Sequence, residues 1–440
     1  MQSHDFLNPV LQPPMKGLPL HIQPLPLSQV GAQGWNVLAD DLPFPVALLK
    51  RDALAHNIAW MAQRTRAWGV ALAPHGKTTM SPQLFAQQLA AGAWGISFGN
   101  VFQLAVGVAA GVRRAIIPNQ VMGAGDLHAI QMLLQAHADL RVLFLIDSVQ
   151  QLALIEAWAA AQPSAQLLRP FELLLEIGFN GGRTGCRDEQ QALAVARAVR
   201  ASSAAQLAGI ECYEGLWAKG ESSADSQWVN TLMDRVDAVA RQCVEESLFA
   251  HEEVIVSAGG SAVFDLVAAR LNPVLGRPGQ VRVTGVLRSG CYVTHDHGTY
   301  TQMMAAMAPR LGCDCADALR PALEVWALVQ SCPEPGLAIV GAGKRDLSFD
   351  MGLPTPIARA APGALQPQAV PAGWHITGLN DQHAYLRWDA ADPALNAQAP
   401  VVGERIGLGI SHPCTTFDKW RWMPVVDEDY GVCEAISTHF

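Results

Sequence analysis

Two features are missing from this 440-residue sequence, and each absence excludes a class of protein. Lysine and arginine form no block and the formal net charge is −9, which argues against a nucleic-acid-binding surface. No apolar run reaches the roughly 18 residues that a membrane-spanning helix needs. Half of the residues are hydrophobic and 16% are charged, so the composition predicts a compact globular protein of about two domains and excludes a disordered chain.

An export signal is also missing. Residues 1–10 contain neither the basic start nor the apolar run of a signal peptide. The nine cysteines are an odd number and lie scattered along the chain, so we expect reduced thiols in the cytoplasm. Cys313 and Cys315 are too close in sequence for an ordinary disulfide, and we predict no role for them.

Short β runs alternate with helical patterns from residue 70 onward. Near-continuous apolar runs such as 142–147 are typical of parallel strands that are covered on both faces. Eight such runs predict a (β/α)₈ barrel, with a doubly wound sheet as the alternative, because one sequence cannot show strand order. The predicted strands are 70–74, 94–98, 115–118, 142–147, 172–177, 207–213, 253–258 and 281–287. The predicted helices are 52–68, 82–91, 100–110, 148–161, 188–201, 225–246 and 263–271, the fifth with Asp188 as N-cap.

The pattern changes on both sides of this region. Residues 1–43 are proline-rich and predict an extended arm lying across a neighbouring surface. After residue 290 the helical periodicity fades, and short β runs separated by Pro/Gly-rich loops predict an antiparallel β domain. We therefore expect an N-terminal extension over 1–43, a barrel over 44–289 and a β domain over 290–440. The strands predicted in the last part are 292–294, 323–330, 337–340, 375–378, 384–388 and 405–410.

Lys77 follows the first predicted strand, at the place where a side chain can point into the mouth of a barrel. Burial and neighbouring charge can lower the pKa of such an amine and make it a nucleophile toward carbonyls. This arrangement suits a lysine that holds pyridoxal phosphate (PLP) as a Schiff base. The alternative is an ordinary surface lysine at a strand end, which this segment alone favours.

A glycine-rich turn follows the seventh predicted strand, where Gly259 and Gly260 precede Ser261. Glycines let backbone N–H groups approach a phosphate, and loops after the late strands of a barrel commonly hold one. A simple strand-to-helix turn with Ser261 as N-cap explains this segment equally well.

His412 and Cys414 form a second notable pair, because residues two apart on an extended segment face the same side. Imidazole with thiolate is a zinc-type ligand pair, although two ligands do not complete a site. The alternatives are a loop histidine near a buried cysteine, and a competing metal cluster at 295–297, which we expect to be a polar loop. Residues 420–422 are expected to contribute packing rather than a pocket rim.

Taken together, these strand ends resemble the fold-type III PLP enzymes with an alanine-racemase-like barrel. The resemblance covers roughly residues 44–425 and is closest to the branch of D-serine dehydratase and D-threonine aldolase. The order of these motifs and their position at the strand ends carry the resemblance. The matching segments are 45–49 with Asn57, 74–78, 183–185, Tyr213, 259–261, 288–292 and 412–414.

The resemblance implies a role for each of these residues. Lys77 would hold PLP, with His75 beside it, and would move the substrate α-proton. The cofactor ring would lie against Tyr213, with Arg183 near its phenolic oxygen. Either Arg288 or Tyr292 would lie near the pyridine nitrogen. The phosphate would be held by Gly259, Gly260 and Ser261 with the amides of Gly290 and Cys291, and the metal by His412 and Cys414.

The resemblance also implies that residues 44–49 join the β domain and that the active site lies at a homodimer interface. The implied reaction is a metal-assisted dehydration of D-3-hydroxy amino acids such as D-serine or D-threonine to a 2-oxo acid and ammonia. The close alternative is a retro-aldol cleavage to glycine and an aldehyde. Cys414 favours dehydration, because a thiolate suits zinc, whereas an aspartate there would suit a harder ion such as manganese. An amino-acid racemase and a non-catalytic PLP carrier are less consistent with the metal pair and the second domain.

Overall fold

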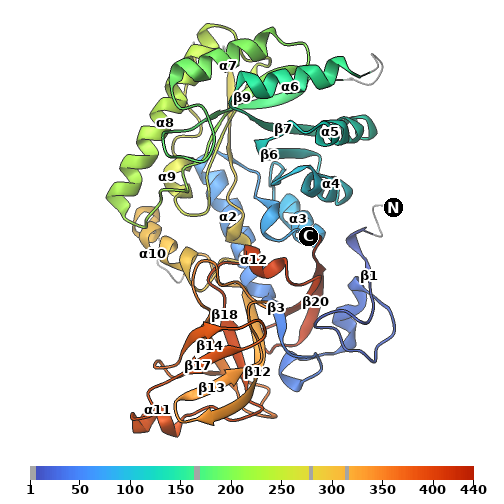
Figure 1. Ribbon diagram of the computed structural model, residues 1–440, viewed down its shortest axis with the longest axis vertical. Helices are drawn as coiled ribbons and strands as arrows, with labels where there is room; N and C mark the ends of the chain where they lie inside the picture. The colour runs from blue at the N-terminus through green and yellow to red at the C-terminus, as the bar shows by residue number, and fades with distance from the viewer. Residues whose placement is uncertain (1–5, 163–168, 277–280, 313–316) are drawn as a thin grey trace.

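The computed structural model describes residues 6–162, 169–276, 281–312 and 317–440, so Cys313 and Cys315 lie outside the described residues. The chain forms a parallel barrel and an antiparallel β domain, which lie one above the other (Figure 1). Within the described residues, every helix is too short or too polar to span a bilayer. The seven cysteines in this part of the chain form no disulfide in the structure.

Eight parallel strands form the barrel, and all eight were predicted. Their sheet order is β4-β11-β10-β9-β8-β7-β6-β5, so neighbours in space follow the chain order. A parallel bridge between His75 and Ser97 joins the two end strands and closes the barrel. The strands are β4 (Ala71–Leu72), β5 (Ile96–Ser97), β6 (Arg114–Gln120), β7 (Arg141–Ile146), β8 (Phe171–Ile177), β9 (Ala205–Cys212), β10 (Glu253–Ala258) and β11 (Arg282–Leu287).

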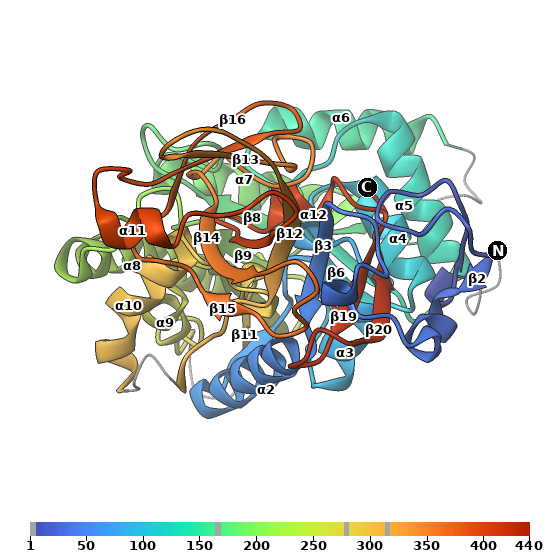
Figure 2. The same ribbon diagram turned by 90° about the horizontal axis from the view of Figure 1, so that it is seen from below.

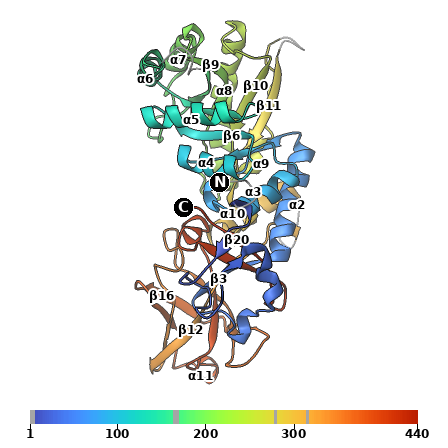
Figure 3. The same ribbon diagram turned by 90° about the vertical axis from the view of Figure 1, so that its right-hand side faces the viewer.

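Helices cover the outside of the barrel (Figure 3). Asp188 caps α7 as predicted, because its side chain accepts a hydrogen bond from the Gln191 N–H at 2.7 Å. The prediction missed α5, whose N-cap Gly123 has no capping side chain. The helices are α2 (Arg51–Trp68), α3 (Pro82–Ala90), α4 (Val101–Ala109), α5 (Ala124–Ala136), α6 (Val149–Ala160), α7 (Glu189–Ala201), α8 (Ser222–Glu245) and α9 (Phe264–Ala268).

The barrel interior is a packed core and not a pore. Small and branched side chains fill it, contributed by each strand from β6 to β11 and by the residue that follows β4. They are Ala73, Ile116, Leu143, Leu145, Leu174, Ala208, Ile255 and Val286. A ligand can therefore be held only at an end of the barrel, and the polar strand ends identify the carboxyl end.

The strands of the β domain pair antiparallel, with one exception. The strand β3 (Val46–Lys50) pairs antiparallel with β12 but parallel with β19. Figure 2 shows this sheet in front of the barrel strands. The strands after β11 are β12 (Leu323–Glu334), β13 (Leu337–Val340), β14 (Thr355–Ala360), β15 (Gln368–Ala369), β16 (His375–Leu379), β17 (Ala384–Arg387), β18 (Arg405–Gly409), β19 (Trp422–Val426) and β20 (Val432–Ser437). Two short helices, α11 (Pro393–Ala397) and α12 (Cys414–Phe417), lie between them.

Two predictions for the region after 290 were wrong. The predicted strand 292–294 is instead the 3₁₀ turn η4 (Cys291–Val293), because its backbone bonds locally, with the His295 N–H donating to the Cys291 carbonyl at 2.7 Å. Helical structure also continues beyond residue 290, in α10 (Thr299–Leu311). The Asp296 carboxylate caps this helix by accepting backbone N–H groups of its first turn.

The proline-rich arm packs on the β domain of its own chain. It consists of β1 (Val10–Leu11), β2 (Leu25–Pro26), η1 (Leu27–Gln33) and η2 (Val37–Ala39), and η1 lies against β20. Trp422 is buried beneath the arm and donates its indole N–H to the Lys16 carbonyl at 3.0 Å. Trp420 is also buried, so both tryptophans contribute packing, as predicted.

Candidate active site

Lys77 lies at the carboxyl end of β4, in the 3₁₀ turn η3 (Gly76–Thr78) that precedes α3. The side chain is exposed at this end of the barrel. His75 precedes the turn, and its Nδ1 is buried without a hydrogen-bond partner among the described residues. Burial lowers the pKa of His75 well below its usual range, and the charges of Lys77, Arg288 and Arg183 act in the same direction. These charges therefore gather at one end of the barrel.

The backbone N–H groups of Gly259 and Gly260, with the Ser261 hydroxyl, form a glycine cradle after β10. Both N–H groups donate to the carboxylate of the buried Glu214, at 3.0 and 2.7 Å. The φ of Gly259 is +102°, a conformation that favours glycine and lets the two N–H groups converge. The Ser261 hydroxyl accepts the Cys291 N–H at 3.3 Å. The cradle thus binds an anionic group in this structure, which is what a phosphate site requires.

Tyr213 and Arg183 lie beside each other at the mouth of the barrel. The Arg183 guanidinium carbon is 5.2 Å from the centre of the Tyr213 ring. Burial raises the pKa of Tyr213, and the Glu214 carboxylate adds to this effect. The loop that carries Arg183 is fixed by its neighbour Thr184, whose hydroxyl donates to Glu176 at 2.7 Å. Two residues predicted to contact one cofactor ring are therefore neighbours.

Arg288 is buried at the end of β11 and faces the neighbouring barrel strands. It forms an ion pair with Glu211 and donates to the Ser257 hydroxyl at 2.7 Å. Burial raises the pKa of Glu211 to about 8, although the Arg288 charge acts in the opposite direction. The second carboxylate oxygen of Glu211 is buried without a hydrogen-bond partner among the described residues. The pair therefore leaves one polar atom available at the barrel end.

Tyr292 points the other way, toward the helices. Its hydroxyl accepts a hydrogen bond from the Gln88 side chain on α3 at 3.0 Å, and burial raises its pKa. Gly290, two residues earlier, permits a close approach, because a Cβ there would lie 2.5 Å from the His75 carbonyl oxygen. This approach brings the segment after β11 onto η3.

Cys291, His412 and Cys414 form a sulfur–imidazole cluster, in which one ligand atom from each residue lies within 4.8 Å of the others. The two sulfurs are 3.6 Å apart. The Thr78 hydroxyl is 3.4 Å from the Cys414 sulfur and 3.6 Å from the Cys291 sulfur. The structure thus brings the two predicted metal ligands to the residue that follows Lys77.

Asp350 orients His412. Its carboxylate lies 2.7 Å from His412 Nδ1 and accepts the Thr415 hydroxyl at 2.9 Å, which leaves Nε2 of the imidazole for the sulfurs or a metal. Burial alone would lower the pKa of His412, but the hydrogen bonds to Cys291 and Asp350 raise it to about 9. Hydrogen bonds from Cys414 and His412 lower the pKa of Cys291, so a thiolate is stabilised here.

The residues at 295–297, which were the alternative metal cluster, contribute to the local structure instead. Asp296 caps α10, and the His295 ring lies 3.4 Å from the Thr301 hydroxyl. Burial lowers the pKa of both His295 and His297 to about 4. Among the described residues, the metal-type group of three is Cys291, His412 and Cys414.

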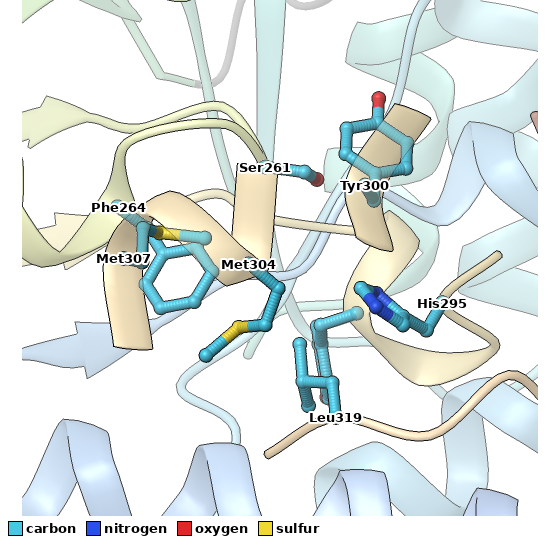
Figure 4. A pocket seen from close by; sticks show the side chains of 8 residues that line it. Ser261, Phe264, His295, Tyr300, Met304, Met307 and Leu319 are labelled. Atoms are coloured by element: carbon cyan, nitrogen blue, oxygen red, sulfur yellow. The ribbon is translucent and has the colours of Figure 1, made fainter. Parts of the chain in front are cut away.

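A pocket borders the glycine cradle at Ser261 (Figure 4). Ser261 lies on its wall, as does Tyr300, which hydrogen-bonds the Cys291 sulfur. The rest of the lining is mostly apolar and comprises Phe264, Tyr292, His295, Met304, Met307 and Leu319.

Several site residues were not predicted from the sequence. Glu211, Glu214, Tyr300 and Asp350 were overlooked, and Cys291 was assigned only its backbone amide. The strand-end segment 211–214 offered a signal, since two acidic residues there must be buried or face the mouth. No spacing pattern connects Asp350 with His412 or Cys291 with Cys414.

Comparisons with known proteins agree with this architecture. Residues 49–283, more than half of the chain, match the family model of the alanine racemase N-terminal domain. Residues 322–426 match a putative serine dehydratase domain.

Two curated relatives span most of the chain. A D-threonine aldolase of Arthrobacter sp is 27% identical over 402 residues, covering 89% of this chain and 92% of the relative. A D-threo-3-hydroxyaspartate dehydratase of Delftia sp. (strain HT23) is 29% identical over 382 residues, covering 85% and 92%.

Solved structures share the fold. D-threonine aldolase from Filomicrobium marinum superposes with a TM-score of 0.72 at 23% identity, covering 90% of this chain and 95% of that one. The dehydratase from Delftia sp. HT23 superposes with a TM-score of 0.68 at 25% identity, covering 92% and 99%.

Proposed function

This chain belongs to the family of the alanine racemase N-terminal domain, and we propose that it is a PLP- and metal-dependent lyase. Its substrates are D-3-hydroxy amino acids such as D-serine or D-threonine. It eliminates water from them, and hydrolysis of the resulting enamine gives a 2-oxo acid and ammonia. The two curated relatives described above, by their names, act on amino acids of this class.

One observation carries the proposal. The Thr78 hydroxyl, directly after Lys77, is 3.4 Å from the sulfur of Cys414, although 336 residues separate Thr78 from Cys414. An amine suited to hold PLP and a ligand pair suited to hold a metal therefore lie side by side. A reaction that needs a base at the α-carbon and an acid at the 3-hydroxyl requires this arrangement.

The residues at the barrel mouth fit PLP. Lys77 would hold its aldehyde, and the glycine cradle, which here binds the Glu214 carboxylate, would hold its phosphate. Tyr213 would lie against the ring with Arg183 at its edge. Arg288, rather than Tyr292, would contact the pyridine nitrogen, because its partners lie on the barrel strands. When bound, PLP supplies an electron sink for the α-carbon of the attached amino acid.

His412 and Cys414 fit a divalent metal such as zinc, with Asp350 holding the imidazole. One solved structure is that of a D-threo-3-hydroxyaspartate dehydratase mutant in the metal-free form. When bound, the metal supplies Lewis-acid assistance for departure of the 3-hydroxyl.

The protein's own groups supply proton transfer and orientation. Lys77 takes the α-proton through its amine, and the hydroxyl of the next residue, Thr78, contacts both sulfurs of the cluster. Glu211 holds the Arg288 guanidinium at the barrel end, and this positive charge would disfavour protonation of the pyridine nitrogen beside it. The apolar wall of the pocket in Figure 4 keeps water from the cradle side.

A retro-aldol cleavage is the second candidate, because the Arthrobacter relative that spans 89% of this chain is a D-threonine aldolase. The thiol of Cys414 favours the dehydratase, since a soft ligand suits zinc. A racemase would make no evident use of the metal pair, and a PLP carrier would make no use of the β domain.

Product analysis separates these reactions. The protein, loaded with PLP and zinc, is incubated with D-serine, D-threonine and D-threo-3-hydroxyaspartate, with the L-enantiomers as controls. We expect pyruvate from D-serine, 2-oxobutyrate from D-threonine, and equimolar ammonia. Glycine with an aldehyde as the main products would reject the dehydratase in favour of the aldolase, and inversion without cleavage would indicate a racemase.

A homodimer in the cytoplasm is also part of the proposal. Exposed apolar side chains lie on loops near the site, and such patches are typical of interfaces. Phe349 and Met351 flank Asp350, and Leu216 and Trp217 follow the Glu214 loop. Light scattering coupled to size-exclusion chromatography tests the dimer, since a monomer at working concentration would contradict it.

A further inference from the structure

We propose that Cys291 is a third protein ligand, so that the metal site is a Cys₂His site made of Cys291, His412 and Cys414. The inference rests on the metal dependence proposed above but goes beyond its ligand pair. Three protein ligands leave one position of a tetrahedral ion for the substrate, as in known catalytic zinc sites with two cysteines and one histidine.

The distance between the sulfurs fits one shared ion. Two thiolates bound to one tetrahedral zinc at about 2.3 Å each lie about 3.8 Å apart. The Cys291 and Cys414 sulfurs are 3.6 Å apart, and the atoms of all three residues lie within 4.8 Å. A disulfide would need about 2.05 Å between the sulfurs. The cluster therefore already has the spacing of metal ligands and not that of a cystine.

The surroundings of Cys291 give its thiol no other evident purpose. The residue is buried, yet its sulfur faces polar groups, namely Thr78, Tyr300 and His412, instead of the apolar core. A cysteine kept for packing would be surrounded by hydrophobic side chains. Asp350 holds the imidazole from behind, which is the outer-shell support typical of a histidine that binds a metal.

Cys291 also connects the two parts of the site. Its backbone N–H donates to Ser261 of the glycine cradle at 3.3 Å, while its sulfur belongs to the cluster. Gly290 makes this position possible through its close approach to His75. A metal on three ligands would therefore be fixed relative to the phosphate of the cofactor, and not only to the β domain.

Cobalt substitution tests the ligand count without relying on turnover. Wild type, Cys291→Ser, Cys414→Ser and the control Cys332→Ser are stripped of metal, reduced and titrated with Co²⁺. Cys332 is an exposed cysteine on β12. The readouts are the thiolate-to-cobalt charge-transfer absorbance per bound ion, and the affinity for cobalt.

We expect Cys291→Ser to lose about half of the charge-transfer absorbance per ion and to bind cobalt about 10-fold or more weakly. Cys414→Ser should behave in the same way, and Cys332→Ser should match wild type. An unchanged spectrum and affinity in Cys291→Ser would overturn the inference, as would absence of cobalt binding by wild type. Circular dichroism of each variant shows whether a lost signal reflects unfolding, and an unfolded Cys291→Ser is replaced by Cys291→Ala.

Intact mass under non-reducing conditions provides a second readout. A metal-loaded wild type lighter by two hydrogens would mean that Cys291 and Cys414 form a disulfide, which also overturns the inference. Failure of the proposed function is distinguishable from both outcomes. Glycine formation would reject the dehydratase while leaving the cobalt spectra intact, whereas normal 2-oxo acid formation with an unchanged Cys291→Ser spectrum would reject only the third ligand.

Discussion

The two halves of the proposed site are assembled in different ways. The cofactor half consists of Lys77, Tyr213, the glycine cradle and Arg288, and all of these follow strands of one barrel. The metal half takes Cys291 from the barrel, but His412 and Cys414 follow β18 and Asp350 follows β13. The barrel alone therefore positions the first half, whereas the second exists only where the β domain meets the barrel.

Because of this difference, metal binding should depend on the contact between the β domain and the barrel. The helix α12, which begins at Cys414, packs on η3 beside Lys77, and Figure 1 shows it between the barrel and the β sheet. We expect metal loss to leave cofactor attachment intact. Loss of the lysine should abolish attachment while leaving metal binding in place.

The largest effect should come from breaking the cofactor half at Lys77. Lys77→Ala removes the amine that holds PLP and takes the α-proton, so we expect turnover to fall by about 10²–10⁴-fold. The visible absorbance of the Schiff base should disappear, while the zinc content stays that of wild type. Lys344→Ala, at an exposed position of the β domain, is the control. Full turnover in Lys77→Ala would remove the basis of the proposed function.

Asp350→Asn tests the other half. The amide keeps the shape of the carboxylate but holds the His412 imidazole more weakly, and loss of such outer-shell support lowers metal affinity by about 10–100-fold. Competition with a chelator measures the affinity, and the PLP absorbance should not change. The matched control is Asp381→Asn, an exposed residue paired with Arg345. A parallel loss of PLP would contradict the separation of the halves.

The same division explains how far the sequence predicted the fold. Barrel strands such as β7 are buried on both faces, so their apolar runs stand out. In the β domain, β14 and β19 were missed because each contains a proline, at 356 and 424, which argues against a strand. A register shift accommodates Pro356 in β14.

Within the site, the residues that could be predicted were those in short motifs of neighbouring residues. Lys77 and Gly259–Gly260 lie in short strand-end motifs, and they were identified as candidates from a few residues around them. The Cys291 thiol was missed because its partner Cys414 lies 123 residues further along the chain. Asp350 was missed for the same reason, being 62 residues from His412. Contacts created by the docking of two domains have no signature in one sequence.

Glu214→Gln tests whether the Glu214 carboxylate competes with the cofactor phosphate for the glycine cradle. The Glu214 carboxylate occupies both N–H groups of the cradle, so its charge should compete with the phosphate of PLP. Two like charges 4 Å apart repel by about 4 kcal/mol at an effective dielectric constant of 20. Part of this is lost to rearrangement, and we expect glutamine to tighten PLP binding by about 10-fold.

Absorbance titration of the reconstituted protein measures this affinity, with Glu156→Gln on the exposed face of α6 as control. Weaker PLP binding in Glu214→Gln would mean that Glu214 maintains the shape of the cradle instead of competing for it. Metal affinity should be unaffected in either case.

The smallest effect should come from the N-terminal arm, which contacts the β domain that carries His412 and Cys414. The Lys16 Nζ lies 2.7 Å from a carboxylate oxygen of the buried Asp346 and 3.9 Å from the centre of the Trp420 ring. The Trp420 indole N–H in turn donates to the backbone carbonyl of Asp346 at 2.8 Å. Lys16→Gln removes a partly exposed ion pair and a cation–π contact, which together are worth about 1 kcal/mol. We expect the melting temperature to fall by about 2 °C, with the control Lys219→Gln unchanged.

The same variant tests whether the arm helps to position the metal ligands. Ser348, two residues before Asp350, donates its N–H to the Thr416 hydroxyl at 2.9 Å. If the arm positions this segment, Lys16→Gln should also weaken metal binding slightly. Metal affinity equal to wild type in a destabilised Lys16→Gln would show that the arm stabilises the β domain without positioning the ligands.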